Sequence, residues 1–317
     1  MALNDSTHPG DGVVFMFAGQ GTQYPGMTGE LYRRDRLFRA ALDEVDELVC
    51  RLSGRSVVAY LYGSDWSFED ILSSHPALFA VQYALAHSLI VRAGLPTYVL
   101  GMSTGEFAAA AVGGAMPLAD AAYCVVEQAR ALARYGDPGG MLAVARPPLL
   151  YEEVPLLRDR CTLALAGRGH FVVAGETGTL ARAAEYLDER GLPHRRLPVR
   201  VGFHSSLIEP AREAYLKAVV GRDPGRPIIP LVSCCAAGIV TGPLPAAHLW
   251  DAISRPMRVL EALRELGERG RFQYVDLGPG TALTILLKQS GIPRAGCRTI
   301  LNPLGDETRR LDALRVA

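Results

Sequence analysis

The sequence lacks the features that mark several classes of protein. Lys217 and Lys288 are its only lysines, and 33 basic residues balance 33 acidic ones, so bulk charge favours neither nucleic acid nor a membrane surface. The longest apolar segments, such as 76–100, are interrupted by polar residues, and none is a candidate membrane span. Residues 1–12 lack the basic start and apolar run of a secretory signal. We therefore expect a cytoplasmic protein that binds neither nucleic acid nor membranes.

Cysteine is present, but not in a pattern that binds metal. No C-x-x-C motif and no Cys/His grouping occurs at metal-ligand spacing, so we expect no metal site. The adjacent pair Cys234 and Cys235 is compatible with a redox role, but buried, reduced thiols are the favoured interpretation. The same interpretation is applied to all six cysteines: Cys50, Cys124, Cys161, Cys234, Cys235 and Cys297.

What is present is an alternation of short apolar strands and helices in a chain of 317 residues, 49% of them hydrophobic. Such a chain can bury the core of an enzyme. The pattern predicts an α/β fold with a mainly parallel sheet. The strands expected in this sheet are 13–17, 97–100 and 273–277, and the helices expected beside it are 77–92 and 106–113.

The character of the chain changes between Gly140 and Pro198, where short strand-like runs surround helices. Strands are predicted at 141–145, 162–166 and 171–174, and a helix at 180–190. We interpret residues 139–198 as an inserted α+β subdomain, and residues 1–138 and 199–317 as the catalytic lobe. Gly139, Gly140 and Pro198 at its edges suit hinges between packed lobes.

A candidate nucleophile lies between a predicted strand and a predicted helix. Residues 101–105 read Gly-Met-Ser-Thr-Gly, a G-x-S-x-G pentapeptide in the context that raises a serine at the top of a sheet. Ser103 is the candidate nucleophile, and the backbone N–H of Thr104 is expected to face a developing oxyanion. Without the strand and helix, such a pentapeptide would be a weak signal.

Serine needs an adjacent base, and seven histidines compete for that role. His204 lies in the segment 201–206, Val-Gly-Phe-His-Ser-Ser, which we expect to follow a short strand. A histidine in such a loop is more often structural when judged alone.

Four motifs in order resemble one family, the malonyl-CoA:acyl carrier protein transacylases, which include the acyltransferase domains of polyketide synthases. They are Phe-Ala-Gly-Gln-Gly-Thr-Gln-Tyr-Pro-Gly-Met at 17–27, Gly-Met-Ser-Thr-Gly-Glu-Phe-Ala-Ala at 101–109, Gly-Phe-His-Ser-Ser-Leu-Ile-Glu-Pro at 202–210 and Asp-Leu-Gly-Pro-Gly at 276–280. The resemblance covers almost the whole chain, and four motifs in register are far more specific than one pentapeptide.

The resemblance implies an α/β-hydrolase-like large lobe with a ferredoxin-like small subdomain. It implies that Ser103 forms the acyl-enzyme and that His204 takes and returns the proton. It also implies that the backbone N–H groups of Gln20 and Thr104 form the oxyanion hole. A backbone carbonyl commonly orients the histidine in this family, so the absence of an obvious acid partner is no objection.

The sequence departs from the family in the helix after the pentapeptide. Gln128 falls where the family has an arginine that clamps the malonyl carboxylate, although Arg130 would be its equivalent if the register shifted by two. Residues i and i+2 do not share a helix face, and the segment 138–141 supports Gln128. A neutral amide cannot compensate a buried carboxylate. An exposed helix residue is the alternative interpretation of Gln128.

Other departures also lower the polarity expected around the acyl group. Met102 replaces a family histidine, Ala166 a family asparagine and His75 a family glutamine, while Gly202 removes volume beside Phe203 and the base. With Gln128, these residues form the predicted acyl pocket. They suggest a bulky monocarboxylic acyl group, such as an aminoacyl, dipeptidyl or polyketide starter unit; neutral drift in a malonyl enzyme is the alternative.

The leading functional hypothesis is a discrete acyltransferase that moves a non-malonyl acyl unit in polyketide or macrolactam biosynthesis. An editing acyl hydrolase shares Ser103 and His204 and is the second hypothesis. A scaffold that only binds carrier protein is disfavoured by the intact Ser103 and His204. An ordinary esterase would need an acid between the serine and a late histidine.

We expect no bound cofactor, because the acyl group would arrive on the phosphopantetheine of an acyl carrier protein, or on CoA. The chain is expected to act as a monomer on donor and acceptor carrier proteins. Carrier proteins are usually acidic, so an arginine-lined rim is expected near the active site. Arg195, Arg196 and Arg200 are its candidates, with a solvated face as the alternative.

Overall fold

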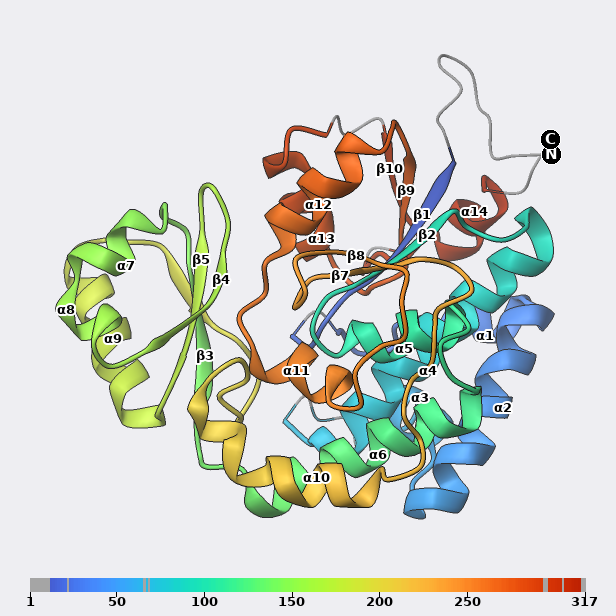
Figure 1. The fold of residues 1–317 in the computed structure, drawn as a ribbon, viewed down its shortest axis with the longest axis horizontal. Coiled ribbons are helices and arrows are strands. Elements are labelled where there is room, and N and C mark those ends of the chain that lie inside the picture. Colours follow the sequence, from blue (N-terminus) through green and yellow to red (C-terminus); the bar gives the residue numbers. More distant parts are fainter. Residues whose placement is uncertain are drawn as a thin grey trace.

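The computed structural model of the protein has a large lobe built on one sheet and a small lobe built on another (Figure 1). The structure describes residues 12–21, 23–64, 67, 69–292, 296–303 and 305–314. Within these residues, no helix is both long and apolar enough to cross a bilayer.

The large lobe contains a mainly parallel sheet of six strands in the order β10-β9-β1-β2-β7-β8, in which only β8 runs antiparallel to its neighbour. Its strands are β1 (Val13–Phe17), β2 (Tyr98–Gly101), β7 (Leu231–Ser233), β8 (Gly238–Val240), β9 (Gln273–Asp276) and β10 (Cys297–Thr299). The central strands β1 and β2 are almost entirely buried, because helices cover both faces of the sheet.

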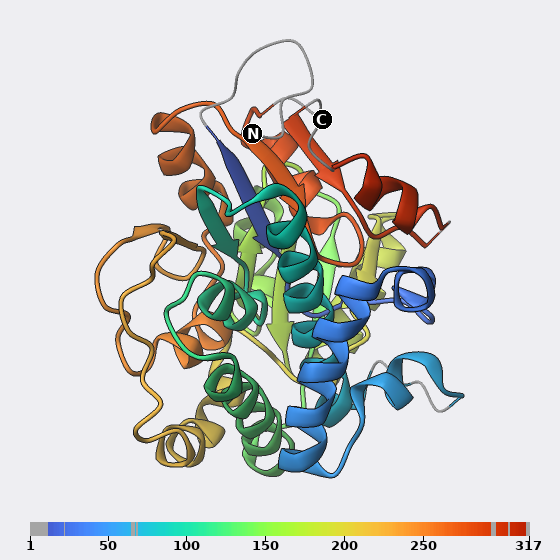
Figure 2. The same cartoon turned by 90° about the vertical axis from the view of Figure 1, so that its right-hand side faces the viewer.

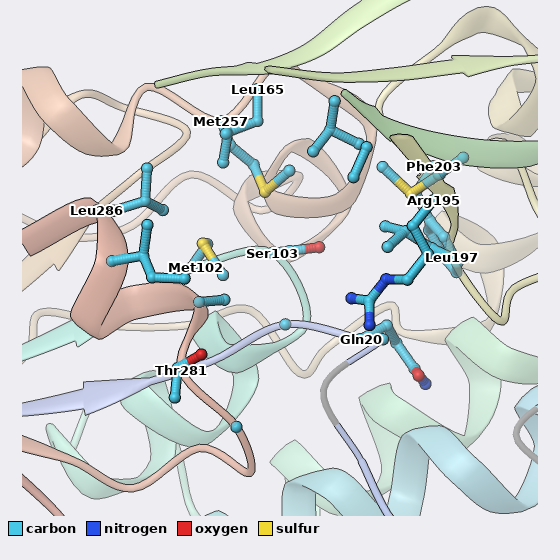
Figure 3. Close-up of a pocket in the computed structure, with 18 of the residues that line it drawn as sticks. Gln20, Met102, Ser103, Leu165, Arg195, Leu197, Phe203, Met257, Thr281 and Leu286 are labelled. Carbon is cyan, nitrogen blue, oxygen red and sulfur yellow. The ribbon is translucent and has the colours of Figure 1, made fainter. Parts of the chain in front are cut away.

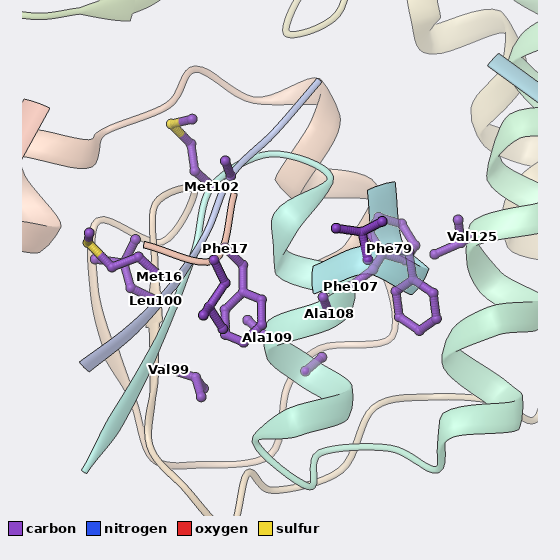
Figure 4. Close-up of a cluster of buried hydrophobic side chains, with 14 of the residues drawn as sticks. Met16, Phe17, Phe79, Val99, Leu100, Met102, Phe107, Ala108, Ala109 and Val125 are labelled. Carbon is purple, nitrogen blue, oxygen red and sulfur yellow. The ribbon is translucent and has the colours of Figure 1, made fainter. Parts of the chain in front are cut away.

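The helices of the large lobe precede and follow these strands along the chain. They are α1 (Gly29–Arg34), α2 (Arg36–Ser53), α3 (Val57–Tyr62), α4 (Ile71–Ala93), α5 (Gly105–Val112), α6 (Leu118–Tyr135), α10 (Arg212–Ala218), α11 (His248–Ser254), α12 (Val259–Glu268), α13 (Ala282–Gln289) and α14 (Glu307–Asp312), with a 3₁₀ helix at Ser206–Ala211. Helices α2, α4 and α6 pack side by side (Figure 2). Phe17, Val99, Phe107 and Ala109 belong to the buried apolar cluster where α5 packs on the sheet (Figure 4).

The small lobe contains a four-stranded antiparallel sheet in the order β4-β5-β3-β6. Its elements follow as β3 (Gly140–Val144), α7 (Leu149–Glu153), α8 (Pro155–Arg158), β4 (Thr162–Ala166), β5 (Phe171–Gly175), α9 (Thr177–Glu189) and β6 (His194–Arg196). This βαββαβ order with its strand arrangement is ferredoxin-like. The helices lie on the outer face of the sheet, away from the large lobe (Figure 1).

The two faces of the small sheet have different roles because side chains alternate along a strand. Leu142, Val144, Phe171 and Val173 point to the helices and form a separate apolar cluster. Met141, Ala143 and Val172 point the other way and line a cavity against the large lobe. The small lobe therefore supplies one wall of that cavity.

Two sequence expectations need correction. No strand directly precedes His204, since segment 197–203 contributes only an isolated bridge between Val201 and Pro138. All six cysteines are unpaired, but Cys50 is exposed on α2, and only Cys124, Cys161 and Cys234 are fully buried.

Candidate active site

The geometry at Ser103 is a tight turn between β2 and α5. Ser103 has a left-handed backbone with φ of 55°. A Cβ atom on Gly101 would lie 2.6 Å from the Cα of Glu106, and one on Gly105 would lie 2.2 Å from the carbonyl oxygen of Phe17. The turn therefore requires glycine at both positions, which is the physical content of the G-x-S-x-G pattern.

His204 approaches Ser103 from the loop before the 3₁₀ helix. Its Nε2 lies 2.9 Å from the Oγ of Ser103. Its Nδ1 donates to the carbonyl oxygen of Arg255 at 2.6 Å, which leaves Nε2 without a proton and able to accept one from the serine. Burial lowers the pKa of His204 to about 4, although the hydrogen bond to Arg255 opposes this. His204 is therefore a neutral base at neutral pH.

The residues expected to form the oxyanion hole lie on either side of the serine. A Cβ atom on Gly19 would lie 2.8 Å from the Cβ of Ser103, so the turn after β1 runs against Ser103. Thr104 precedes α5 and places its backbone N–H at the amino end of that helix. The Gln20 side chain is held by Gln23 and by the Oγ of Ser74, at 3.2 Å from the latter.

A cavity of about 440 Å³ opens above Ser103, between the two lobes (Figure 3). Most of its wall is apolar. Three parts of the chain contribute to it: the small lobe, helix α13 and the loop that precedes α12. The apolar lining includes Met102, Met141, Leu165, Leu197, Phe203, Met257 and Leu286. Besides Ser103 and His204, the polar side chains in the wall are Gln20, Gln23, Tyr24, His170, Arg195 and Thr281.

Only Met102 and Phe203, of the six residues predicted to form the acyl pocket, line this cavity. Ala166 is exposed at the end of β4 and lines a separate surface hollow, because its neighbour Leu165 takes the inward position. Gly202 is buried, but a Cβ atom there would point at Leu207 and Ser205 rather than into the cavity.

Gln128 and His75 are buried beside the cavity rather than in its wall. The Nδ1 of His75 lies 2.7 Å from the Oε1 of Gln128, and the His75 ring packs on Phe203 with centroids 5.4 Å apart. Burial lowers the pKa of His75 to about 4, so both groups are uncharged. The Nε2 atoms of both residues have no hydrogen-bond partner among the described residues.

Burial distinguishes Gln128 from Arg130, the two candidates for the family's arginine position. Gln128 is 0% exposed on the inner face of α6. Arg130 lies on the outer face, where its guanidinium pairs with Glu127 and donates to the carbonyl oxygen of Leu52. Arg130 therefore does not line the cavity above Ser103.

The three arginines predicted at the rim are separated by the structure. Arg195 lines the cavity, and its side chain extends toward Gln20 (Figure 3). Arg196 and Arg200 line a different hollow at the edge of the small lobe, where Arg200 pairs with Glu69 and Arg196 donates to the carbonyl oxygen of Thr177. Alternation along β6 explains why neighbouring arginines diverge.

Several lining residues were missed from the sequence. Met141, Val172 and Met257 carry no motif, and only the alternation of β3 and β5 could have indicated that one face of the small sheet was free of helices. Thr281 and Leu286 follow the glycine turn 278–280, which a buried Asp276 holds by accepting from the N–H of Gly278 at 3.0 Å and from the hydroxyl of Thr284 at 3.1 Å.

Comparison with known proteins gives a consistent result. The chain is 37% identical over 310 residues to the polyketide biosynthesis acyltransferase homolog BaeD of Bacillus velezensis, and covers 95% of each chain. It is 36% identical to the homolog PksD of Bacillus subtilis, again over 95% of each. Among solved structures, a loading acyltransferase from the avermectin modular polyketide synthase aligns with a TM-score of 0.87 at 29% identity, over 95% of this chain and 97% of that one. Since the family described as acyl transferase domain also matches residues 14–296, the chain belongs to the acyl transferase domain family.

Proposed function

We propose that this polyketide biosynthesis acyltransferase carries a non-malonyl, monocarboxylic acyl group on Ser103. The group would be an aminoacyl or other starter-type unit, delivered from the phosphopantetheine of an acyl carrier protein or from CoA. No bound cofactor is needed, since the reaction is an exchange of acyl acceptors. The support is the acyl transferase family assignment together with the hydrogen bond between Ser103 and His204.

The chemistry follows from the geometry of these two residues. Ser103 Oγ attacks the thioester carbonyl while His204 Nε2 takes its proton, and the backbone N–H groups of Gln20 and Thr104 receive the negative charge on the carbonyl oxygen. The C–S bond then breaks, and His204 returns the proton to the leaving thiolate. A second thiol attacks the serine ester by the reverse sequence. The proposed mechanism is therefore ping-pong exchange through a Ser-His dyad.

The proposed preference against malonyl rests on one observation, the uncharged pair of Gln128 and His75 where the family resemblance places a carboxylate clamp. Gln128 Oε1 already faces His75, and neither residue can neutralise a carboxylate. The mostly apolar wall of the cavity is equally unsuited to the negative charge of a malonyl carboxylate. Arg195 is the cation in the cavity lining, and it lies at an exposed position on β6.

A competition between donors tests this preference. Malonyl and methylmalonyl thioesters should acylate Ser103 roughly a hundredfold more slowly than monocarboxylic or amide-bearing thioesters, since a buried unpaired charge costs a few kcal/mol. The adduct is followed by intact mass. Equal loading of malonyl would contradict the proposal and would point to Arg195 as the clamp.

Hydrolysis of the acyl-enzyme is the second candidate, as in an editing hydrolase. The observation in its favour is that Gln23, Tyr24, His170 and Thr281 line the cavity and offer hydrogen bonds to an attacking water. Met102, which stands where the family has a histidine, favours transfer over hydrolysis, because it places an apolar side chain directly beside Ser103.

Mixing the protein with an acylated donor carrier and an unacylated acceptor carrier separates the two. Transfer predicts gain of the acyl mass on the acceptor with little free acid. Free acid that forms at the same rate with and without the acceptor would show that the enzyme is a hydrolase. Ser103→Ala serves as the control for spontaneous thioester hydrolysis.

A further inference from the structure

One short helix holds His204 by its backbone. The N–H of His204 donates to the carbonyl oxygen of Ile253, in the last turn of α11, at 2.9 Å. Its Nδ1 donates to the carbonyl oxygen of Arg255, which follows the same helix, at 2.6 Å. The position of the base therefore depends on where the carboxyl end of α11 lies.

The other end of α11 is tied to the helix that carries the nucleophile. His248, the first residue of α11, places its Nε2 2.7 Å from the Oε2 of Glu106. Glu106 lies in the first turn of α5, three residues after Ser103. The two helices are in contact, and they lie next to each other below the large sheet in Figure 1.

The Glu106 carboxylate is deeply buried and fully engaged. Glu106 is 0% and His248 4% exposed. Besides His248, the carboxylate accepts from the hydroxyl of Ser233 at 3.0 Å and from the N–H of Cys235 at 3.3 Å. A buried charge is tolerated only where partners satisfy it, and this one has partners beyond α11. The proposed acyl transfer uses none of these groups.

Glu106 and His248 thus connect the two halves of the catalytic pair through rigid structure. From His248 to Ile253 the chain advances five helical positions, or about 7.5 Å. A link of that length transmits a shift of α11 directly to His204. Positioning matters here because a displacement of about 1 Å between nucleophile and base can cost about a hundredfold in rate.

We propose that Glu106 and His248 are positioning residues, which hold Ser103 and His204 at hydrogen-bond distance by fixing α11 against α5. The inference rests on the proposed roles of Ser103 and His204. A pair that contributed only to stability would leave the activation of Ser103 unchanged in folded variants. A metal ion bridging the pair would bind in a defined ratio, since Glu106, Cys235 and His248 offer ligand atoms within 4.8 Å of one another.

The experiment measures how fast a fluorophosphonate probe labels Ser103, since this rate depends on serine activation and not on the acyl group that the enzyme prefers. The variants are His248→Ala, His248→Gln and Glu106→Gln. The matched control is Arg92→Gln, which removes another largely buried ion pair, between Arg92 and Asp35, away from the catalytic residues. Thermal melting and circular dichroism establish which variants are folded.

We expect His248→Ala to slow labelling at least tenfold, and His248→Gln, which keeps an N–H donor, to recover part of the loss. Arg92→Gln should lower the melting temperature without slowing labelling. The pH profile should also change. Burial lowers the pKa of His204 and keeps it neutral in the wild type, so labelling should be flat near neutrality. A displaced, hydrated His204 should titrate near its ordinary pKa, which makes labelling fall between about pH 7 and 5.

The outcomes separate the two proposals. Labelling that persists in Ser103→Ala would remove the catalytic assignment itself. Labelling with unchanged rate and pH profile in folded His248→Ala and Glu106→Gln would overturn the positioning role alone. Loss of labelling in Arg92→Gln as well would show that the Glu106 and His248 variants act through a general loss of stability, and would overturn the positioning role. A stoichiometric metal in the wild type, absent in Cys235→Ser, would replace the direct pair by a metal bridge and overturn the proposal.

Discussion

Ser103 and His204, whose Oγ and Nε2 atoms are 2.9 Å apart, both have left-handed backbones, with φ of 55° and 61°. This conformation is unfavourable for residues other than glycine, and strain of this kind persists only where the surrounding structure imposes it. At Ser103 it is imposed by the tight turn, in which the backbone at Gly101 runs close to Glu106 and the backbone at Gly105 runs close to Phe17. At His204 it is imposed by hydrogen bonds to the carbonyl oxygens of Ile253 and Arg255. The strain therefore accompanies the alignment of the two side chains.

Removing either side chain should abolish acyl-enzyme formation. Since the proposed nucleophile and base would act as one unit, Ser103→Ala and His204→Ala should each lower the rate by several orders of magnitude, and combining them should add little. Intact mass with an acyl donor measures the adduct. An adduct that survives in folded Ser103→Ala would show that another residue is the nucleophile.

The strain at Ser103 also predicts a difference in stability between two inactive variants. Glycine tolerates the left-handed conformation but gains more freedom on unfolding, so Ser103→Gly should be more stable than Ser103→Ala by up to about 1 kcal/mol. Thermal or urea denaturation measures the difference. Equal or lower stability of Ser103→Gly would mean that the turn stores little strain.

Local sequence was enough to predict the elements that position Ser103. The strand expected at 13–17 matches β1 residue for residue, and the helix expected at 106–113 matches α5 within one residue. Both depend on short apolar runs bounded by glycine. The helix expected at 77–92 begins earlier, at Ile71, and includes Pro76, because the Asp70 side chain caps it by accepting from the N–H of Leu72 at 3.1 Å.

The cavity wall was harder to predict because it depends on how the two lobes pack. Ala166 was expected in the wall by its place in the sequence, but Leu165 faces inward and packs at the lobe junction, where Met257 donates its N–H to the carbonyl oxygen of Ala164 at 2.8 Å. Gln128 was expected to line the same pocket, but it faces His75 across the core between α4 and α6. Neither contact has a local sequence signal.

The two buried histidines predict a loss of stability in acid. Burial lowers the pKa values of His75 and His204 to about 4, so below about pH 6.5 the unfolded chain binds protons that the folded chain excludes. Each histidine should contribute about 3 kcal/mol at pH 7 that is lost as the pH falls toward 4. Burial raises the pKa of Asp276 to about 7, so this carboxyl makes the folded state more stable as the pH falls from 7 to 4. The effect of one histidine is therefore measured as the difference in unfolding free energy between wild type and a variant.

The matching measurement compares wild type with His75→Gln in urea denaturation from pH 7.5 to 4.5. His75→Gln should lose less stability over this range, by an amount approaching 3 kcal/mol. Parallel curves for the two proteins would show that His75 does not resist protonation in the folded state.

Gln128→Arg should shift donor preference toward malonyl and lower stability at the same time. An arginine at this fully buried position would carry an unpaired charge in the free enzyme, at a cost of about 3 kcal/mol or more. A malonyl carboxylate could pair with it in the acyl-enzyme if the Phe203 ring moves aside. Competition between malonyl and monocarboxylic thioesters measures the preference, and Arg130→Ala is the surface control.

An unchanged preference in folded Gln128→Arg would show that the acyl group does not approach α6. In that case the charge preference would have to be set by the cavity wall itself.

Arg195 is predicted to recognise the carrier rather than the acyl group. It lies at an exposed position on β6 at the edge of the catalytic cavity, where a cation can attract an acidic carrier protein or the phosphate of its phosphopantetheine. Arg195→Ala should therefore lower kcat/KM about tenfold for a carrier-bound donor, mainly through KM, and more at low salt. Arg196→Ala is a close control, because that neighbour faces a different hollow. A small thioester that lacks carrier and phosphate should react equally with both variants; a loss with this donor as well would place Arg195 in the acyl site instead.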